Sequence, residues 1–251
     1  MGERVVIKRP ISSSACNLIV HIIVGADRGL EGGKLYYFGP GPRASRSSMV
    51  SQEDAVAKSP YYVDPARMTP LQKHCAFFDR NGDGILMPWE TFAGFRVLGY
   101  GMAMSLLGTL LVHLFFSYWT LPSWVPDPFF PIYIKNVDRL KHGSDSGLYD
   151  YDGTLKPVVG DGVQTLIGRF DEDAKGGLGL LDMYRMTQRK WNVLDLFGWW
   201  ATKLEWFFLW VLAQRHGVVS WDVIRDQYDG TLFRKVEASR APNATADKRA
   251  H

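Results

Sequence analysis

One segment of this chain, Asp79 to Glu90, has the residue pattern of a calcium-binding loop held between two helices. Asp79, Asn81 and Asp83 stand at positions 1, 3 and 5, where side-chain oxygens ligate the cation. Ile85 at position 7 would donate its backbone carbonyl, and Glu90 at position 12 would close the site as a bidentate carboxylate. With every ligand position but the ninth filled, the segment predicts one intact calcium site.

The residues around this loop support the same interpretation. Gly84 occupies position 6, where the chain must turn sharply at a backbone conformation that glycine adopts cheaply. Met87 at position 9 has no side-chain oxygen, so a water would complete the site. Thr69 followed by Pro70 is typical of a helix start, and residues 71–78 then form an entering helix.

A long apolar stretch follows almost at once. Residues 97–121 contain no Asp, Glu, Lys or Arg, and about 20 apolar residues suffice to cross a bilayer as a helix. A buried helix of a soluble protein is the alternative. The next segment cannot continue a helix because four prolines are close together, and it favours a sharp reversal: Pro122, Pro126, Pro128 and Pro131. The chain therefore either spans once or dips in and returns.

Composition excludes several classes of protein. A hydrophobic content of 46% and nine tryptophans in 251 residues exclude a disordered chain. A net charge of +3 without a basic stripe gives no support for nucleic-acid binding. Two cysteines, Cys16 and Cys75, are too few for a disulfide framework, which favours a reducing, cytosol-facing setting.

The remaining segments show weaker patterns. Leu18 to Val24 could form a short strand inside an otherwise irregular extension, and Ala238 to His251 predicts a disordered tail. Residues 148–159 are a calcium-like loop without the necessary ligands, which could be the structural partner of the intact one. Similar weak cases lie at 171–182 and 214–221. Helices are expected at 182–186 and 194–214. The sequence Tyr-Asp-Gly-Thr-Leu occurs twice, at 151–155 and 228–232.

Four blocks of sequence resemble the caleosins, calcium-binding proteins of lipid droplets that act as haem-dependent peroxygenases. They are the helix and loop from Leu71 to Arg96, the proline-rich turn ending at Pro128–Ile134, residues 141–147, and residues 195–199 together with Glu205–Trp206. The resemblance covers about Met68 to Phe233. It implies a mainly α, EF-hand-type helical protein with one intact calcium loop, degenerate EF-like partners and a proline-knot membrane-associated helical hairpin.

The resemblance also implies an arrangement of segments. We expect residues 1–66 as an N-terminal extension with little regular structure, 67–96 as an EF-hand, 97–134 as the apolar membrane or lipid-droplet segment with its proline knot, 135–237 as a C-terminal helical domain with degenerate EF-like loops, and 238–251 as a disordered tail. The expected location is the lipid droplet or endoplasmic reticulum membrane, with the soluble parts facing the cytosol.

The implied activity transfers oxygen from a fatty-acid hydroperoxide to an unsaturated lipid or another acceptor, with haem b and Ca²⁺ as cofactors. In the family two histidines bind haem, and both motif positions are occupied here, by His74 and His142. One would be the proximal ligand, and the other a second ligand or a distal acid–base group. Cys75 is a competing ligand, since thiolate-bound haems also activate peroxides.

A shared haem constrains the topology. His74 precedes the apolar stretch and His142 follows it, so a single span would place them on opposite sides of about 30 Å of hydrocarbon. Shared ligation requires the chain to dip and return, or to lie on the surface. The aromatic runs at 197–200 and 206–210 either line an acyl-chain tunnel or pack the helices.

Two other functions remain open. The chain could be a calcium-responsive coat protein of lipid droplets without significant catalysis. It could also be a calcium sensor that recruits partners, although one intact loop argues against this. Expected partners are the droplet or reticulum membrane, fatty-acid hydroperoxides and unsaturated lipids; self-association is open, and nucleic acid is not expected.

Overall fold

The computed structural model describes residues 59–156 and 162–240. The predicted strand at 18–24 and nearly all of the predicted N-terminal extension lie outside these ranges. The predicted tail is corrected at its start, because helix α10, Leu232–Arg240, includes residues 238–240. Leu232 and Phe233 bury this helix against the core, which extends the ordered chain further than its polar composition indicated.

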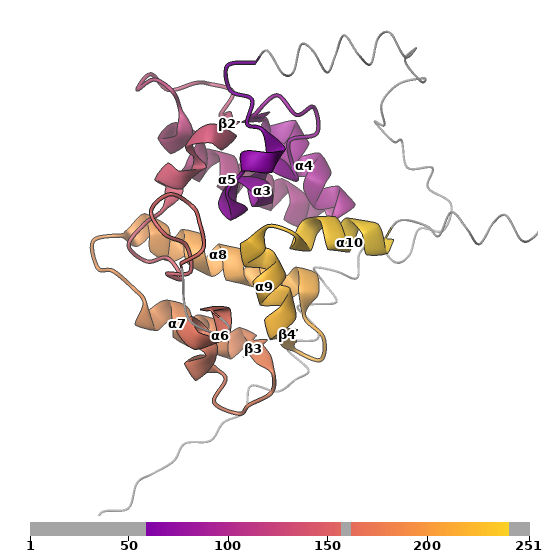
Figure 1. The fold of residues 1–251 in the computed structure, drawn as a ribbon, viewed down its shortest axis with the longest axis vertical. Helices are drawn as coiled ribbons and strands as arrows, with labels where there is room; N and C mark the ends of the chain where they lie inside the picture. The colour runs from indigo at the N-terminus through magenta and orange to yellow at the C-terminus, as the bar shows by residue number, and fades with distance from the viewer. Residues whose placement is uncertain (1–58, 157–161, 241–251) are drawn as a thin grey trace, which may run out of the picture.

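The described residues are mainly helical, as predicted, with two short two-stranded sheets (Figure 1). The first part contains η2 (Pro65–Arg67), α3 (Pro70–Ala76), β1 (Ile85–Leu86), α4 (Pro88–Val97), α5 (Met102–Thr120), β2 (Ile132–Tyr133) and η3 (Ile134–Leu140). The second contains α6 (Gly162–Ile167), η4 (Gly168–Phe170), β3 (Gly177–Gly179), α7 (Leu180–Arg189), α8 (Leu196–Ala213), β4 (Val218–Ser220), α9 (Trp221–Asp229) and α10.

Helix α3 begins where the sequence predicts. Thr69 is its N-cap and accepts a hydrogen bond from the backbone N–H of Gln72 at 3.2 Å. The Gln72 side chain returns the bond by accepting from the Thr69 N–H at 3.0 Å. Pro70 occupies the first turn, where its missing N–H costs nothing. These local contacts fix the start of the helix that carries His74.

The strand inside the predicted calcium loop pairs with an unexpected partner. Ile85 pairs with Tyr133 and Leu86 with Ile132, in antiparallel register. The predicted partner, 148–159, is therefore corrected: the partner strand comes directly after the prolines. Residues 148–159 instead form a small turn closed by a bridge between Tyr149 and Leu155. Which strand pairs with β1 depends on tertiary packing, since α5 and η3 place β2 beside the loop.

The two weaker loop-like segments pair with each other. Strand β3, inside 171–182, lies antiparallel to β4, with Leu178 opposite Val219. Both of these residues are fully buried. The second half of the chain thus repeats the arrangement of the first, a helix–strand–helix unit paired through its strands with another.

Helix α5 is the predicted apolar helix, and it is the one helix among the described residues that is long and apolar enough to cross a membrane. Its outward face is apolar: Leu106 is 63% exposed and Leu110 59%. Its polar residues face the protein, since His113 is 3% exposed and Ser117 2%. The distribution is the reverse of that in a surface helix of a soluble protein.

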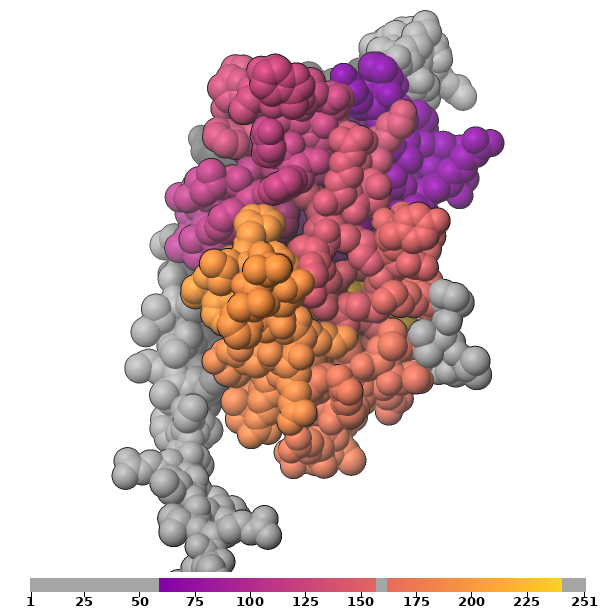
Figure 2. All heavy atoms as spheres, turned by 90° about the vertical axis from the view of Figure 1, so that its left-hand side faces the viewer, coloured from indigo at the N-terminus to yellow at the C-terminus, as the bar shows by residue number. Residues whose placement is uncertain are grey.

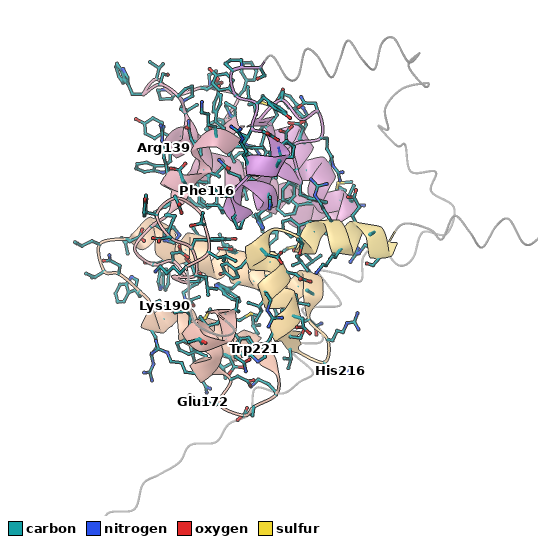
Figure 3. All side chains as sticks on the ribbon, viewed as in Figure 1. Phe116, Arg139, Glu172, Lys190, His216 and Trp221 are labelled. Atoms are coloured by element: carbon teal, nitrogen blue, oxygen red, sulfur yellow. The ribbon has the colours of Figure 1, made fainter. Side chains whose placement is uncertain are left out.

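The two halves of the molecule meet around a shared interior. α3 packs against both η3 and α9, which connects the first half with the second. In Figure 1, α8 runs beneath α3 and α5, and α10 reaches back beside α4. Gly108 allows α5 to approach α8 closely, because a Cβ there would lie 2.8 Å from Phe208 and from Phe95. Figure 3 shows side chains of both halves meeting in this interior, with Phe116 at the boundary.

Candidate functional site

A cavity of about 240 Å³ lies between the two halves. Its wall is mostly aliphatic and aromatic, contributed by α3, α4, α5, α8, α9 and α10. A few groups in the wall can act chemically: His74, Cys75, His142, Asp145, Glu205 and Gln227. His74 and His142, which the sequence analysis singled out, therefore line one cavity although they lie 68 positions apart in the sequence.

The repeated Tyr-Asp-Gly-Thr-Leu motif helps to position His74. Both copies form the same turn, in which a threonine hydroxyl donates to an aspartate at 2.6 Å: Thr154 to Asp152, and Thr231 to Asp229. The glycines of the two turns, Gly153 and Gly230, have φ near +80° and both lie against α3. The repeat therefore holds the start of α3 from two sides, which its sequence alone did not reveal.

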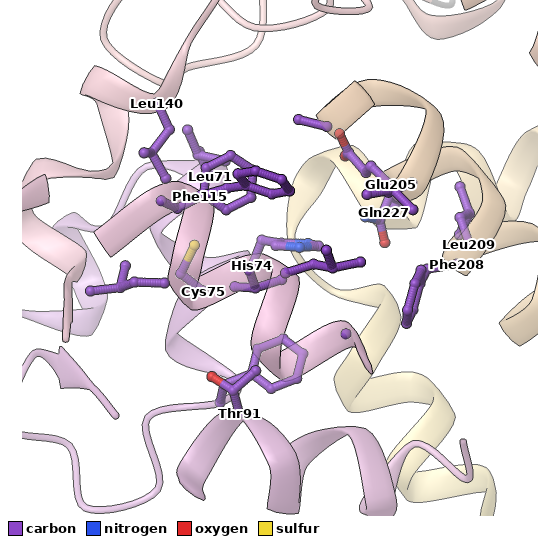
Figure 4. A pocket seen from close by; sticks show the side chains of 18 of the residues that line it. Leu71, His74, Cys75, Thr91, Phe115, Leu140, Glu205, Phe208, Leu209 and Gln227 are labelled. Atoms are coloured by element: carbon purple, nitrogen blue, oxygen red, sulfur yellow. The ribbon is translucent and has the colours of Figure 1, made fainter. Parts of the chain in front are cut away.

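His74 projects from α3 into the cavity (Figure 4). Burial lowers the pKa of His74 to about 4, against an opposing hydrogen bond to the backbone of Gln227. The imidazole is therefore neutral at physiological pH. Because one ring nitrogen donates to the Gln227 carbonyl, the other keeps a free lone pair. A neutral imidazole with its tautomer fixed in this way is a competent ligand for a metal ion.

His142 is held from the opposite direction by a carboxylate. Its Nδ1 lies 3.1 Å from Asp195 Oδ2, and the same oxygen accepts the Ser144 N–H at 2.8 Å. Asp195 is also the N-cap of α8, accepting the Gly198 N–H at 2.8 Å. Although burial opposes it, these bonds together with His142 keep the pKa of Asp195 below its ordinary value. The ionised carboxylate fixes Nδ1–H as the donor and leaves Nε2 free.

Glycine is required beside this pair. A Cβ at residue 198 would lie 2.1 Å from His142 Nδ1 and 2.2 Å from Asp195 Oδ2, well inside contact distance. Gly198 thus lets the imidazole and the carboxylate sit on the first turn of α8. Any side chain here would displace one of the two.

Cys75 lines the same cavity but is a poor candidate for an anionic ligand. Burial, and then the nearby Glu205, raise the pKa of the Cys75 thiol to about 12. At neutral pH the sulfur is therefore protonated, and a thiolate would need a strong compensating charge. The packed thiol is part of the apolar wall.

The predicted calcium loop has a compact backbone. Asp79 accepts the N–H groups of Gly82 at 2.8 Å and Gly84 at 2.9 Å, and Glu90 accepts that of Met87 at 3.0 Å. Gly84 has φ +83°, and a Cβ there would lie 2.0 Å from the Tyr61 carbonyl oxygen. Glycine at position 6 is thus required by both backbone conformation and close packing.

The acids of this loop repel one another. Burial raises the pKa of Glu90, against the Met87 hydrogen bond, and Asp79 and Asp83 raise it further. Burial likewise raises the pKa of Asp79, which also faces Asp83. No group of three or more His, Cys, Asp or Glu side chains in the described parts of the chain is close enough to hold a metal as placed. A cation bound here would relieve the repulsion between these acids.

The proline segment folds back onto α5 through the polar face of that helix. His113 bonds the Phe130 carbonyl through Nδ1 at 2.7 Å and the Thr91 hydroxyl through Nε2 at 2.7 Å. Ser117 donates to the Pro131 carbonyl at 2.7 Å. Pro131 is buried by this contact, whereas the other three prolines, Pro122, Pro126 and Pro128, are exposed. The chain therefore reverses at the prolines and returns along the helix.

An apolar surface extends from α5 to the start of α8. Figure 2 shows this face, with α5 and residues 121–131 above the orange start of α8. Phe197 of α8 contacts Phe115 and Phe116 of α5, with ring centroids 5.1 and 5.8 Å apart. The large apolar side chains exposed from α5 to the start of α8 include Met102, Leu106, Leu107, Leu110, Leu114, Tyr118, Trp119, Trp124, Val125, Phe129, Phe130, Trp191, Val193, Leu194, Leu196 and Trp200.

Comparison with known proteins identifies the family. The family model described as "Caleosin related protein" matches residues 66–237. The chain belongs to the caleosin family. Caleosins are in general associated with membranes or lipid, which agrees with the exposed apolar face of α5.

The relatives support a peroxygenase function in general terms. A "Peroxygenase" of Lilium longiflorum is 39% identical over 198 residues, covering 74% of this chain and 82% of the relative. A "Probable peroxygenase 4" of Arabidopsis thaliana is 36% identical over 172 residues, covering 68% and 87%. A "Probable inactive peroxygenase-like protein" of the same plant is 27% identical over 156 residues, covering 62% and 74%. No solved structure matches this caleosin.

Several residues of the site were not singled out from the sequence. Asp195, Gly198 and Glu205 lie in a block that was noted only for its resemblance, and Gln227 was not noted at all. Glu205 could have been recognised from the sequence as a candidate site residue, because it is an acid within a tryptophan-rich helix. The pairing of His142 with Asp195 across 53 positions leaves no local trace in the sequence.

Proposed function

We propose that this caleosin is a calcium-binding haem peroxygenase that acts on fatty-acid hydroperoxides and unsaturated lipids at a lipid surface. The observation that carries the proposal is the single cavity that both His74 and His142 line. The haem-binding part of the proposal depends on the donor chemistry of these residues, and the peroxygenase part on the relatives.

The residues of the cavity fit haem b. Each imidazole has one nitrogen engaged by an acceptor, the Gln227 backbone or Asp195, and the other available. The rest of the wall is largely aliphatic and aromatic, as a macrocycle and an acyl chain both require. A volume of about 240 Å³ is below the roughly 300–1,000 Å³ typical of ligand pockets, so haem is expected to widen it.

The two histidines would then have different roles at the haem. When bound, haem supplies an iron centre that breaks the O–O bond of a hydroperoxide and delivers the oxygen to an acceptor. The Asp195 carboxylate accepts from His142 Nδ1–H and orients the ring with Nε2 available, which would suit a permanent ligand of the haem iron. His74, neutral and hydrogen-bonded only to a backbone carbonyl, would be the exchangeable or distal histidine.

Calcium would act through helix α3. The loop acids Asp79 and Glu90 follow this helix, and Asp79 lies five residues after His74. Ca²⁺ would be held by the side chains of Asp79, Asn81, Asp83 and Glu90 with the Ile85 carbonyl, and would order the end of α3. This EF-hand would therefore stabilise the position of one histidine.

The apolar surface would contact a lipid droplet or the endoplasmic reticulum membrane. The hydrogen bonds of His113 and Ser117 hold the proline segment against α5, so a spanning orientation would have to break them. Because both histidines line one cavity, α5 would lie in the lipid surface with its leucines immersed. The proline knot would be the point of return of this hairpin.

A second candidate function is favoured by the same surface. A coat protein of lipid droplets needs the exposed apolar face but no chemistry in the cavity. A relative named as a probable inactive peroxygenase-like protein supports a candidate function without catalysis. The absorption spectrum separates the two candidates.

The test is the Soret band of the detergent-solubilised protein after haem reconstitution with calcium. We expect a Soret band in the wild type, its loss in His142→Ala, and retained haem with lost hydroperoxide turnover in His74→Ala. His216→Ala is the matched control, because this exposed histidine lies on a loop away from the cavity (Figure 3). A wild-type protein without a Soret band would contradict the haem enzyme and leave the coat protein.

A further inference from the structure

Glu205 is a carboxylic acid in the middle of the molecule. It projects from α8 into the cavity, and its side chain is accessible from that space (Figure 4). An acid in an apolar environment costs free energy unless it is paired or neutral. The charged neighbour that affects it most is another acid, Asp145. Its position is therefore not explained by a stabilising ion pair.

Gln227 connects this acid with His74. The Gln227 side chain hydrogen-bonds Glu205, and its backbone carbonyl accepts from the His74 ring. Its side-chain oxygen is buried and has no hydrogen-bond partner. The amide therefore directs its N–H₂ to the carboxylate and presents an unused acceptor, which suits the O–H of a polar ligand in the cavity.

Burial, and then the charge of Asp145, raise the pKa of Glu205 to about 7, against the hydrogen bond from Gln227. The other titratable and charged groups that line this cavity are His74 and Cys75 of α3, Tyr100 before α5, Lys141, His142, Asp145 and Tyr149 after η3, and Tyr228 of α9. Burial keeps His74 and Cys75 neutral at pH 7, and it raises the pKa of Tyr149 and Tyr228 well above the ordinary value. Glu205 can therefore both accept and release a proton near neutrality.

We propose that Glu205, which Gln227 connects with His74, is the proton-transferring residue of the hydroperoxide reaction. The inference rests on the peroxygenase function proposed above. A hydroperoxide R–O–OH passes its terminal oxygen to an unsaturated lipid and becomes the alcohol R–OH. The O–O bond breaks, the hydroperoxide gains two electrons and the lipid loses two.

One proton must move during this step. It leaves the terminal oxygen of the hydroperoxide and ends on the alkoxy oxygen. Glu205 takes this proton as a carboxylate and returns it to the departing oxygen as a carboxylic acid, so the residue ends as it began. Gln227 holds the carboxylate through its N–H₂ group and orients the substrate through its free oxygen.

The test compares Glu205→Gln with Glu205→Asp in the haem-loaded protein. In Glu205→Gln we expect kcat/KM for a fatty-acid hydroperoxide to fall by about 10²–10⁴-fold, with haem affinity and the Soret band unchanged. The wild-type rate should rise with pH through about 7, and this limb should be absent in Glu205→Gln. Glu205→Asp, which keeps the acid, should retain the limb with an intermediate rate.

Two further readouts keep the proposal falsifiable if Glu205→Gln fails to fold. Asp145→Asn removes the neighbouring charge and should move the rising limb to lower pH. Infrared spectra of the haem-free protein should show a carboxyl band that titrates near pH 7 and keeps doing so in Glu205→Asp. A merely structural Glu205 would still show the titrating carboxyl band, but the rising limb of the rate would not move in Asp145→Asn.

The outcomes separate this inference from the proposed function. Glu205→Gln turnover within about threefold of wild type, or an unchanged pH limb, would overturn the role of Glu205 while leaving the haem enzyme intact. A wild-type protein that binds no haem would instead overturn the peroxygenase itself. If Glu205→Gln loses the rising pH limb of the rate but keeps the Soret band, both the role of Glu205 and the haem peroxygenase are supported.

Discussion

The two halves of this caleosin contain loops of similar design that carry their charges at different positions. In the loop 79–90 the first acid, Asp79, accepts backbone N–H groups of the turn, and the last, Glu90, accepts the N–H of residue 87. In 171–182, Asp171 accepts the N–H groups of residues 175–177 and Asp182 that of residue 179. The two loops therefore share two backbone contacts, in which the N–H of position 6 donates to the first acid and the N–H of position 9 donates to the last.

Position 5 distinguishes them. It is Asp83 in the first loop and Lys175 in the second. The Lys175 ammonium lies 2.9 Å from Asp182, 3.2 Å from Asp173 and 3.8 Å from Asp171. The second loop thus carries its own cation, whereas the acids of the first face one another without one. An ammonium group at position 5 thus balances loop charge that a bound metal ion would otherwise have to balance.

The largest expected effect is the loss of the first loop's cation. In Glu90→Gln we expect calcium affinity to fall by more than the roughly 10–100-fold that loss of an outer-shell partner costs, because a direct ligand is removed. Isothermal titration measures the affinity. Calcium should also raise the free energy of unfolding of the wild type by about 2.7 kcal/mol at ~100 times Kd, and should not do so in the variant.

Asp182→Asn is the matched control for this variant, since it changes the twelfth position of the second loop. Its calcium affinity should equal that of the wild type. A large loss of calcium binding in Asp182→Asn, with binding retained in Glu90→Gln, would reverse the assignment of the two loops.

A smaller effect is a gain of function in the second loop. Replacing Lys175 by Asp removes the internal ammonium and places a ligand at position 5, so calcium stoichiometry should rise from one to two. The new site should be the weaker one, because Asp182 is shorter than the usual glutamate at position 12. Lys175→Arg, which keeps the charge, should still bind one calcium, and an unchanged stoichiometry in folded Lys175→Asp would refute the comparison.

The smallest effect is a difference in pH dependence without calcium. Asp79 and Glu90 have raised pKa values in the fold, so the folded chain binds more protons than the unfolded one. The free energy of unfolding should therefore fall as pH rises from about 4 through these raised pKa values. Urea unfolding in chelator measures it, and the slope should be smaller in Glu90→Gln.

The second loop should respond at the other end of the pH scale. Although burial opposes it, hydrogen bonds to Asp182 and Asp173 raise the pKa of Lys175 above 10.5. Its contribution to stability is fully present below pH 10.5 and is lost as pH rises through the folded pKa. If the free energy of unfolding depended on pH equally in wild type and Lys175→Met above pH 10.5, the proposed difference between the two loops would be refuted.

The local features of the fold were predictable from the sequence. The start of α3 at Thr69 and Pro70, the turn at Gly84, and the apolar helix before the prolines each follow from a few adjacent residues. The histidine pair was predicted from resemblance, and the structure places both residues on one cavity. The pairing partner of the calcium loop was predicted wrongly, because it depends on how α5 and the proline segment pack.

What the sequence determined by itself is therefore short-range chemistry. It shows which residues cap a helix, which loop has the ligands for a hard cation, and which helix is long and apolar enough to cross a membrane. The tertiary structure alone decided that Asp195 holds His142, that Glu205 and Gln227 reach the same cavity, and that Lys175 neutralises its loop. These contacts join residues by packing across elements, and the free energy that selects them belongs to the whole core rather than to any segment.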